Sequence, residues 1–237
     1  TTFAVNFPIT CAYDNYTYWD LSGLELSSPA AADEPTPTTT TFYEPILAYL
    51  DSEPPTFEDD FSTNLHMEAW GFTSEGEVLG GGIGGGRLGV DDSLEYGLGV
   101  HFPTNGMLDA EDFAFKFDFT TDSEMEYIGM KFWDKGDPLT INVGYSLRIS
   151  NSGSWSLVQN VDDSEIQSGT TPSFLEGGIN TLLLVGQNTN IVAFLNDELL
   201  FTALGLEGYN DNNAIIVKGK ESGDGDASFD NIQFWNL

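Results

Sequence analysis

The sequence predicts an all-β protein: a two-sheet antiparallel β-sandwich of the jelly-roll type, with an extended N-terminal strand and a Pro/Thr-rich linker in front of it. Short runs with β-type patterning follow one another from about residue 57 to the C-terminus, and turn residues separate them. No long helical pattern interrupts these runs, which favours two packed sheets. With 237 residues, 40% of them hydrophobic, the chain can bury a sizeable core.

Residues 1–26 form the predicted N-terminal arm, and they begin with the most regular alternation in the chain. Every second residue is apolar over the set Phe3, Val5, Phe7, Ile9, Cys11 and Tyr13. A period of two predicts a β-strand with one buried face. Since burial of six apolar side chains is favourable, the strand should join a sheet, either in its own chain or in a neighbouring subunit.

Residues 27–56 form the predicted linker. They begin with a Pro/Thr-rich run that cannot pack a core and should be extended. Further on, Pro45 suits the first position of a helix, and Ile46 and Leu50 follow at helical spacing. The linker is therefore expected to contain one short helix, which the Pro54-Pro55 pair ends.

Residues 57–237 form the predicted sandwich domain. Its Phe113 to Phe119 segment alternates Phe with smaller or polar residues, which is typical of a strand with one solvated face. The Asn196-Asp197 pair predicts a tight hairpin, and the Gly80 to Gly86 run a hairpin loop. Thirteen strands are expected, at 71–79, 87–91, 95–102, 112–120, 126–133, 145–150, 154–159, 165–168, 181–187, 191–195, 199–202, 214–218 and 229–235.

The charge of the chain limits its partners. Seven Lys and Arg residues stand against 38 Asp and Glu residues, so the net charge is −31. Nucleic acid and anionic membrane surfaces would be repelled, and cations are the expected small partners. No stretch of 18 apolar residues predicts a membrane span, and the single cysteine, Cys11, excludes an internal disulfide. Because the chain begins without Met, we expect a mature secreted product that is extracellular or at the cell surface.

Acidic residues near both ends of the sandwich domain suggest a structural calcium site. Calcium takes six to eight oxygen ligands and accepts carboxylates from separate strands. If the first and last strands are neighbours, five carboxylates come together there: Asp59, Asp60, Asp224, Asp226 and Asp230. The calcium ion is the one cofactor that the sequence suggests.

Several segments of the domain occur in a recurring order. They are Ser150 to Leu157, Asn180 to Leu184, Val192 to Asp197 and Phe229 to Phe234, after an Asp-Asp-Phe-Ser run at Asp59 to Ser62. In this order the domain resembles the concanavalin A-like lectin and laminin G-like sandwiches, including domains of secreted bacterial proteins. The resemblance implies a lectin-like fold and a carbohydrate ligand.

The same superfamily contains glycosidases with a Glu-x-Asp-x-x-Glu strand. The nearest match here is Glu124-Met125-Glu126, and Gly129 stands where the last acid belongs. Retaining glycosidases need two carboxylates close together. We therefore predict no catalytic residues and no enzymatic activity.

Aromatic and Asn residues supply the remaining candidate sites. Tyr127, Trp133 and Trp155 could form a platform on which a sugar ring stacks, although a core position is the simpler interpretation of a Trp. Asn15 begins the Asn-Tyr-Thr motif of an N-glycosylation site.

Two functions compete on this reading. The leading hypothesis is a structural subunit of an extracellular filament or surface layer, in which the N-terminal strand adds to the sandwich of an identical subunit. The alternative is a carbohydrate-binding module of a secreted or cell-surface protein, which the lectin-like resemblance implies. A glycan-active enzyme is a third and weaker hypothesis, because the acid partner is missing.

Overall fold

The computed structural model separates the chain into two units, Thr1–Thr40 and Thr41–Leu237. The residues that it describes all belong to the second unit: 41–63, 77–78, 81–84, 87–91, 98–101, 108–134, 144–207, 212–219 and 226–237. The predicted N-terminal strand from Phe3 to Tyr13 and the predicted glycosylation site at Asn15 lie outside this part. Strand donation and glycosylation therefore stay predictions.

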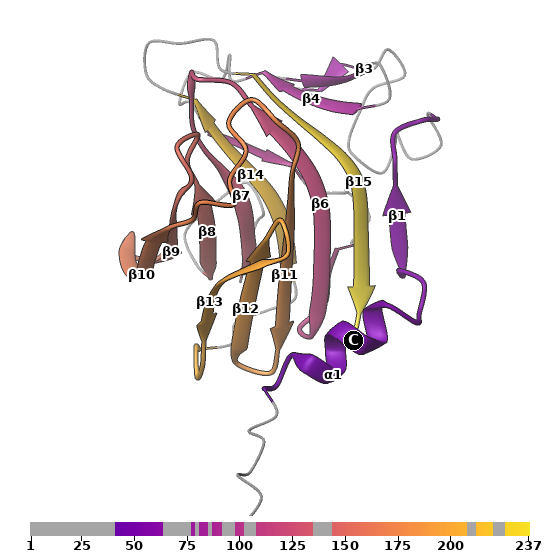
Figure 1. The fold of residues 1–237 in the computed structure, drawn as a ribbon, viewed down its shortest axis with the longest axis vertical. Coiled ribbons are helices and arrows are strands. Elements are labelled where there is room, and N and C mark those ends of the chain that lie inside the picture. Colours follow the sequence, from indigo (N-terminus) through magenta and orange to yellow (C-terminus); the bar gives the residue numbers. More distant parts are fainter. Residues whose placement is uncertain are drawn as a thin grey trace, which may run out of the picture. The chain divides into compact units, whose positions relative to one another are not determined.

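The larger of two sheets contains nine strands and the C-terminal end of the chain (Figure 1). Its hydrogen-bonded order is β13 (Glu198–Ala203), β12 (Asn190–Leu195), β11 (Asn180–Gln187), β6 (Phe113–Thr121), β15 (Asp226–Asn236), β4 (Arg87–Asp91), β3 (Gly81–Gly84) and β2 (Glu77–Val78). The ninth strand, β1 (Phe57–Asp59), pairs with β15 in addition. The first and last strands of the domain are thus neighbours, which is the condition that the calcium hypothesis required.

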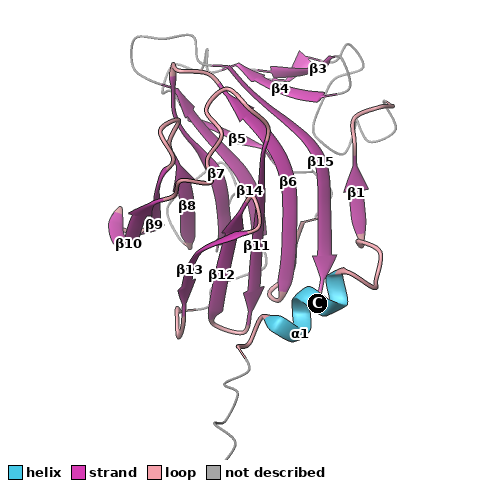
Figure 2. Cartoon of the chain, viewed as in Figure 1, coloured by secondary structure: helices cyan, strands magenta, loops and turns pink. Residues whose placement is uncertain are grey.

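The smaller sheet contains six strands, and Figure 2 shows them behind and beside the larger sheet. Their order is β10 (Ser164–Thr170), β9 (Ser154–Gln159), β8 (Tyr145–Ile149), β7 (Met125–Asp134), β14 (Asn212–Gly219) and β5 (Leu98–His101). Every strand pairing in both sheets is antiparallel. The predicted fold class, an antiparallel β-sandwich, is confirmed.

The core lies between the two sheets and is rich in aromatic side chains. Phe113, Phe115, Phe117 and Phe119 of β6 all point into it and are fully buried. Phe115 and Phe117 lie 5.2 Å apart between ring centroids, and Phe117 meets Phe229 of β15 at 5.6 Å. The strict alternation in this segment therefore predicted its buried face correctly.

Each of the thirteen predicted strands overlaps an observed strand, and the Asn196-Asp197 hairpin is confirmed. Both of its residues have positive φ, 50° and 66°, as the tight turn between β12 and β13 requires. The loop predicted across Gly80 to Gly86 is wrong, because Gly81–Gly84 forms β3 and pairs with both β2 and β4. Three of the four residues of β3 are glycines, so no alternation of apolar and polar side chains marks this strand in the sequence.

A short helix, α1 (Glu44–Leu50), covers part of the outer face of the larger sheet. It begins with Pro at its first turn, as expected. Its Ile46 is buried in a second apolar cluster with Val185, Val192 and Trp235. The Trp235 indole nitrogen donates a hydrogen bond to the carbonyl of Glu53 at 3.0 Å.

The helix belongs to the sandwich unit, which begins at Thr41, although the predicted linker extended to residue 56. Figure 1 shows α1 beside the end of β15. Among the described residues, no helix is long and apolar enough to cross a bilayer.

Candidate functional site

The outer face of the smaller sheet carries the polar side chains of β7 to β10. Ile128, Leu147 and Leu157 point into the core from three of these strands. Because side chains alternate along a strand, their neighbours Tyr127, Arg148 and Ser156 point outward. On the larger sheet, the corresponding outer face is the one against which α1 packs.

A shallow depression of about 660 Å³ lies on this outer face. It extends across four strands, from β7 to β10, and so measures roughly 14 Å across the strands. Tyr127 and Arg148 line it together with the carboxylates of Glu126 and Glu165. Hydroxyl side chains supply much of the remaining lining: Ser150, Ser154, Ser156, Ser168 and Thr170.

Arg148 occupies a fixed position at this depression. The Cζ atom of its guanidinium lies 5.2 Å from the centroid of the Tyr127 ring, within the range of a cation–π contact. Its Nη2 donates a hydrogen bond to Asp163 Oδ1 at 2.7 Å, and the two groups form an ion pair. The side chain remains 21% exposed, and among the described residues neither Nε nor Nη1 has a hydrogen-bond acceptor. Arg148 is therefore held in place while part of its donor capacity stays unused.

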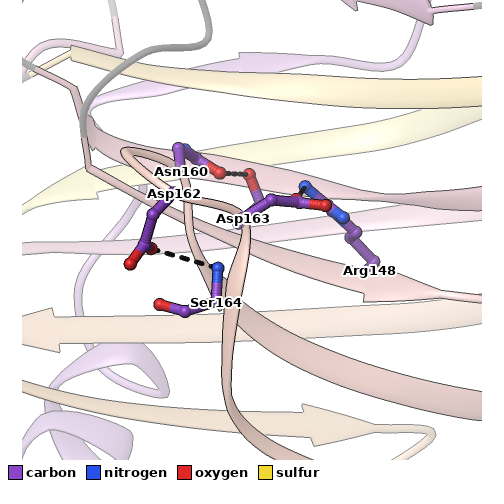
Figure 3. A network of polar contacts seen from close by, with 6 residues as sticks. Arg148, Asn160, Asp162, Asp163 and Ser164 are labelled. Atoms are coloured by element: carbon purple, nitrogen blue, oxygen red, sulfur yellow. Dashed lines mark hydrogen bonds and ion pairs between the residues drawn. The ribbon is translucent and has the colours of Figure 1, made fainter.

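The turn between β9 and β10 positions Asp163 for this ion pair (Figure 3). Asp163 has a positive φ of 55°, a conformation that Asp tolerates better than most residues. On one side of it, Ser146 donates a hydrogen bond to Asn160 Oδ1 at 2.6 Å. On the other, hydrogen bonds from the hydroxyl and the backbone N–H of Ser164 lower the pKa of the neighbouring Asp162. These hydrogen bonds favour the ionised form of the Asp162 carboxyl.

The hydroxyl groups come from adjacent strands in register. Ser156 of β9 stands opposite Ser168 of β10, and Ser154 stands opposite Thr170. Ser168 donates a hydrogen bond to Glu165 at 2.7 Å. A hydroxyl can both donate and accept, so this row offers a polyhydroxylated ligand both kinds of partner.

Two of the three predicted stacking residues are core residues instead. Trp133 is 1% exposed, and its indole nitrogen donates to the Glu111 carbonyl at 2.7 Å. Trp155 is 7% exposed, and its indole stacks on Phe201 of the larger sheet with 5.1 Å between ring centroids. A stacking role is wrong for Trp133, because burial leaves no face of its ring for a ligand. Trp155 is among the residues that line the depression, but its ring is nearly buried and one face is already stacked on Phe201. Tyr127, half-buried and at the depression, stays a candidate.

The acidic residues of the predicted calcium site are brought together only in part. Asp59 and Asp60 line a second depression, of about 410 Å³, beside Asn231 of β15. Asp59 accepts a hydrogen bond from the Phe61 N–H, and hydrogen bonds from Ser62 lower the pKa of Asp60. Within the described ranges, no group of three acidic, His or Cys side chains could hold a metal ion.

Asp230 accepts a hydrogen bond from the Asn231 N–H and lies outside the lining of that depression. Asp224 and the side chain of Asp226 lie outside the described residues. The calcium site therefore stays a prediction.

Sequence reasoning did not identify Arg148 or the row of hydroxyls as site residues. The signal was the alternation of Ser150, Ser152, Ser154 and Ser156, which puts hydroxyls on one side of β9 and of the turn before it. Arg148 is also one of only seven basic residues in the chain. In the sequence, Arg148 stands just before this Ser-rich segment of a strongly acidic chain, and that neighbourhood could have marked the site.

No protein-family model matches the chain, and no curated protein is similar enough in sequence to match it. Solved structures nonetheless share its fold. The carbohydrate-binding module CBM66 from Bacillus subtilis is 16% identical, with a TM-score of 0.50 over 63% of this chain and 86% of that one. The exoplasmic/lumenal domain of VIP36, bound to Ca2+ and Man3GlcNAc, is 9% identical, with a TM-score of 0.51 over 66% of this chain and 81% of that one.

A third structure comes from work on the endo-acting O-glycanases with which members of the human gut microbiota initiate mucin breakdown. It is 10% identical, with a TM-score of 0.54 over 77% of this chain and 99% of that one. At such low identities these likenesses establish the fold alone. The chain is a lectin-like β-sandwich.

Proposed function

We propose that this protein is a carbohydrate-binding module of a secreted or cell-surface protein, and that the glycan lies on the outer face of the smaller sheet. One observation carries the proposal: the depression combines the outward aromatic ring of Tyr127, the fixed Arg148 and a row of hydroxyls. Ligand sites in proteins typically combine apolar contact area with a few well-placed polar groups.

Each part of the depression matches a property of sugars. The apolar face of a pyranose ring packs against an aromatic ring, for which Tyr127 is available. Sugar hydroxyls accept hydrogen bonds from the guanidinium of Arg148 and exchange them with Ser and Thr hydroxyls. The volume of about 660 Å³ is within the usual range for a small-molecule site.

The solved structures of the same fold agree with the proposal, although they share only the fold with this chain. A carbohydrate-binding module and a domain with bound Man3GlcNAc are among them. Since one fold hosts many functions, the argument rests on the depression itself. The filament hypothesis now ranks second, because solved structures of the same fold include carbohydrate-binding domains; the strand on which it depends lies outside the described residues. We propose no catalytic role for the exposed Glu124 and Glu126.

Substitution of Tyr127 tests the proposal. A glycan array probed with the full chain identifies a ligand, and isothermal titration calorimetry measures its affinity for the Tyr127→Ala variant. We expect the affinity to fall by about tenfold, or roughly 1.4 kcal/mol, because the stacking surface is lost. Tyr127→Phe keeps the ring and should retain most of the affinity.

Tyr49→Ala provides the matched control, since Tyr49 is an exposed aromatic residue of α1 on the opposite sheet. Its affinity should not change. Equal affinities for Tyr127→Ala and the unaltered protein, with both folded by circular dichroism, would place the glycan elsewhere.

A further inference from the structure

The electrostatics of the depression distinguish between classes of glycan. Arg148 is its cation, and the carboxylates of Glu126 and Glu165 also line it. A sugar carboxylate or sulfate would bind to Arg148, because a guanidinium donates two parallel hydrogen bonds to such anions. Whether an anionic glycan is accepted therefore depends on how far the charge of Arg148 is already compensated.

Asp163 compensates that charge. It forms the 2.7 Å ion pair with Arg148 and is itself 72% exposed on the rim of the turn. The neighbouring carboxylate of Asp162 adds a further negative charge to the turn, and hydrogen bonds from Ser164 lower its pKa. An incoming anion would meet one paired cation and several carboxylates, in a chain whose net charge is −31. Repulsion between these carboxylates and an anionic glycan would lower the affinity for that class of ligand.

The remaining hydrogen-bonding groups suit an uncharged ligand. Nη1 of Arg148 has no acceptor among the described residues, and the oxygen of a sugar hydroxyl can provide one, whereas Nε is buried out of a ligand's reach. Ser154 and Thr170, opposite each other on β9 and β10, can exchange hydrogen bonds with further hydroxyls. These contacts require no charge on the ligand.

From this we infer that the depression selects neutral glycans and rejects sialylated, uronic-acid and sulfated ones, with the Arg148–Asp163 ion pair as the determinant of that selectivity. The inference rests on the proposed function and adds the ligand class to it. Asp163 determines specificity without touching the ligand, since it acts by occupying the charge of Arg148.

The Asp163→Asn variant of the full chain separates this role from general repulsion. Asn fits the positive φ at this position and keeps a hydrogen-bond acceptor, but it releases the charge of Arg148. Glu53→Gln is the matched control, because it removes one carboxylate next to α1 on the other sheet. The probes are matched pairs of oligosaccharides, such as asialo and sialylated N-glycans, and plain and sulfated galactans.

The affinities are measured at about 10 mM and about 0.3 M NaCl, which give long and short screening lengths. For the unaltered protein we expect neutral members to bind roughly tenfold or more tightly than their anionic counterparts at low salt, with little salt dependence of the neutral affinity. Asp163→Asn should reduce this preference by at least about threefold, whereas Glu53→Gln should leave it nearly unchanged.

Three results would count against these conclusions. Tighter binding of the anionic members by the unaltered protein would overturn the inference and leave the carbohydrate-binding function standing. An unchanged preference in Asp163→Asn would overturn the role of the ion pair. Binding of no oligosaccharide in the panel would overturn the proposed function, and the inference with it.

Discussion

Gly129 allows the two strands that carry Tyr127 and Arg148 to approach closely. It lies on β7 directly opposite Arg148 on β8. A Cβ atom at this position would overlap the carbonyl oxygen of Leu147 and lie 2.8 Å from its carbonyl carbon. Both atoms belong to the backbone, so no side-chain rotation can relieve the overlap. The spacing of β7 and β8 under the depression thus depends on a residue without a side chain.

Gly129→Ala should therefore destabilise the protein by about 2 kcal/mol or more, because one strand must shift away from the other. Gly177→Ala is the comparison, since a Cβ there meets open space and only the positive φ of 65° disfavours it, by roughly 1 kcal/mol. Urea denaturation of both variants measures the two free energies of unfolding. An equal or smaller loss for Gly129→Ala would contradict the close approach.

Single residues also show why the site was only partly predictable. Tyr127 and Trp133 share β7 and the same parity, so alternation places both on one face. A register shift opposite Met125 and Tyr127 changes the parity at one end of the strand. At the other end Trp133 has a φ of 53°, and its indole turns into the core. Neither departure leaves a mark in the amino-acid pattern.

At the scale of elements, α1 closes the outer face of the larger sheet over a second apolar cluster. Ile46 is its buried residue and belongs to the same cluster as side chains of β6, β11, β12 and β15. The hydrogen bond from Trp235 to Glu53 fixes the segment that follows the helix. A helix of seven residues has little stability of its own, so packing on the sheet maintains it.

Ile46→Ala should lower the free energy of unfolding by about 2 kcal/mol, since it removes buried apolar volume from this cluster. Tyr49→Ala on the same helix should change it by less than about 0.5 kcal/mol, because Tyr49 is 44% exposed. Both values come from chemical denaturation. Glycan affinity should be the same in both variants, and a loss of affinity in Ile46→Ala would mean that the ligand reaches the larger sheet.

The elements differ in how far the sequence predicts them. β6 is plain in the sequence because its four Phe residues alternate and all face one core. β3 is not visible in the sequence, since three of its four residues are glycines and show no alternation of apolar and polar side chains. β1 was missed because its three residues are too few to show a period. A strand is predictable where its side chains alternate between apolar and polar over several residues, and it is missed where glycines or a short length leave no such pattern.

At the scale of the whole molecule, the two outer faces of the sandwich differ. The larger sheet carries α1, and the smaller sheet carries the polar depression. The described residues of the core and of the depression all lie within 41–237, which form one unit.

A protein that lacks residues 1–40 should keep both the thermal transition and the glycan affinity of the full chain, because the described residues of the core and of the depression all lie within 41–237. Differential scanning calorimetry and titration with the same glycan measure the two properties. The strand-donation hypothesis makes a separate prediction for this protein, the loss of self-association in analytical ultracentrifugation. A fall in the melting temperature would instead show that the N-terminal strand pairs within its own chain.

The position of Asp163 in a surface turn has an evolutionary consequence. The turn joins β9 to β10, and β10 is the last strand in the order of the smaller sheet. An insertion or substitution between residues 160 and 163 would move this carboxylate relative to Arg148 and leave the Phe-rich interior unaffected. Descendants of this sequence could thus exchange one class of sugar for another through changes in a few turn residues, while the sandwich itself is inherited intact.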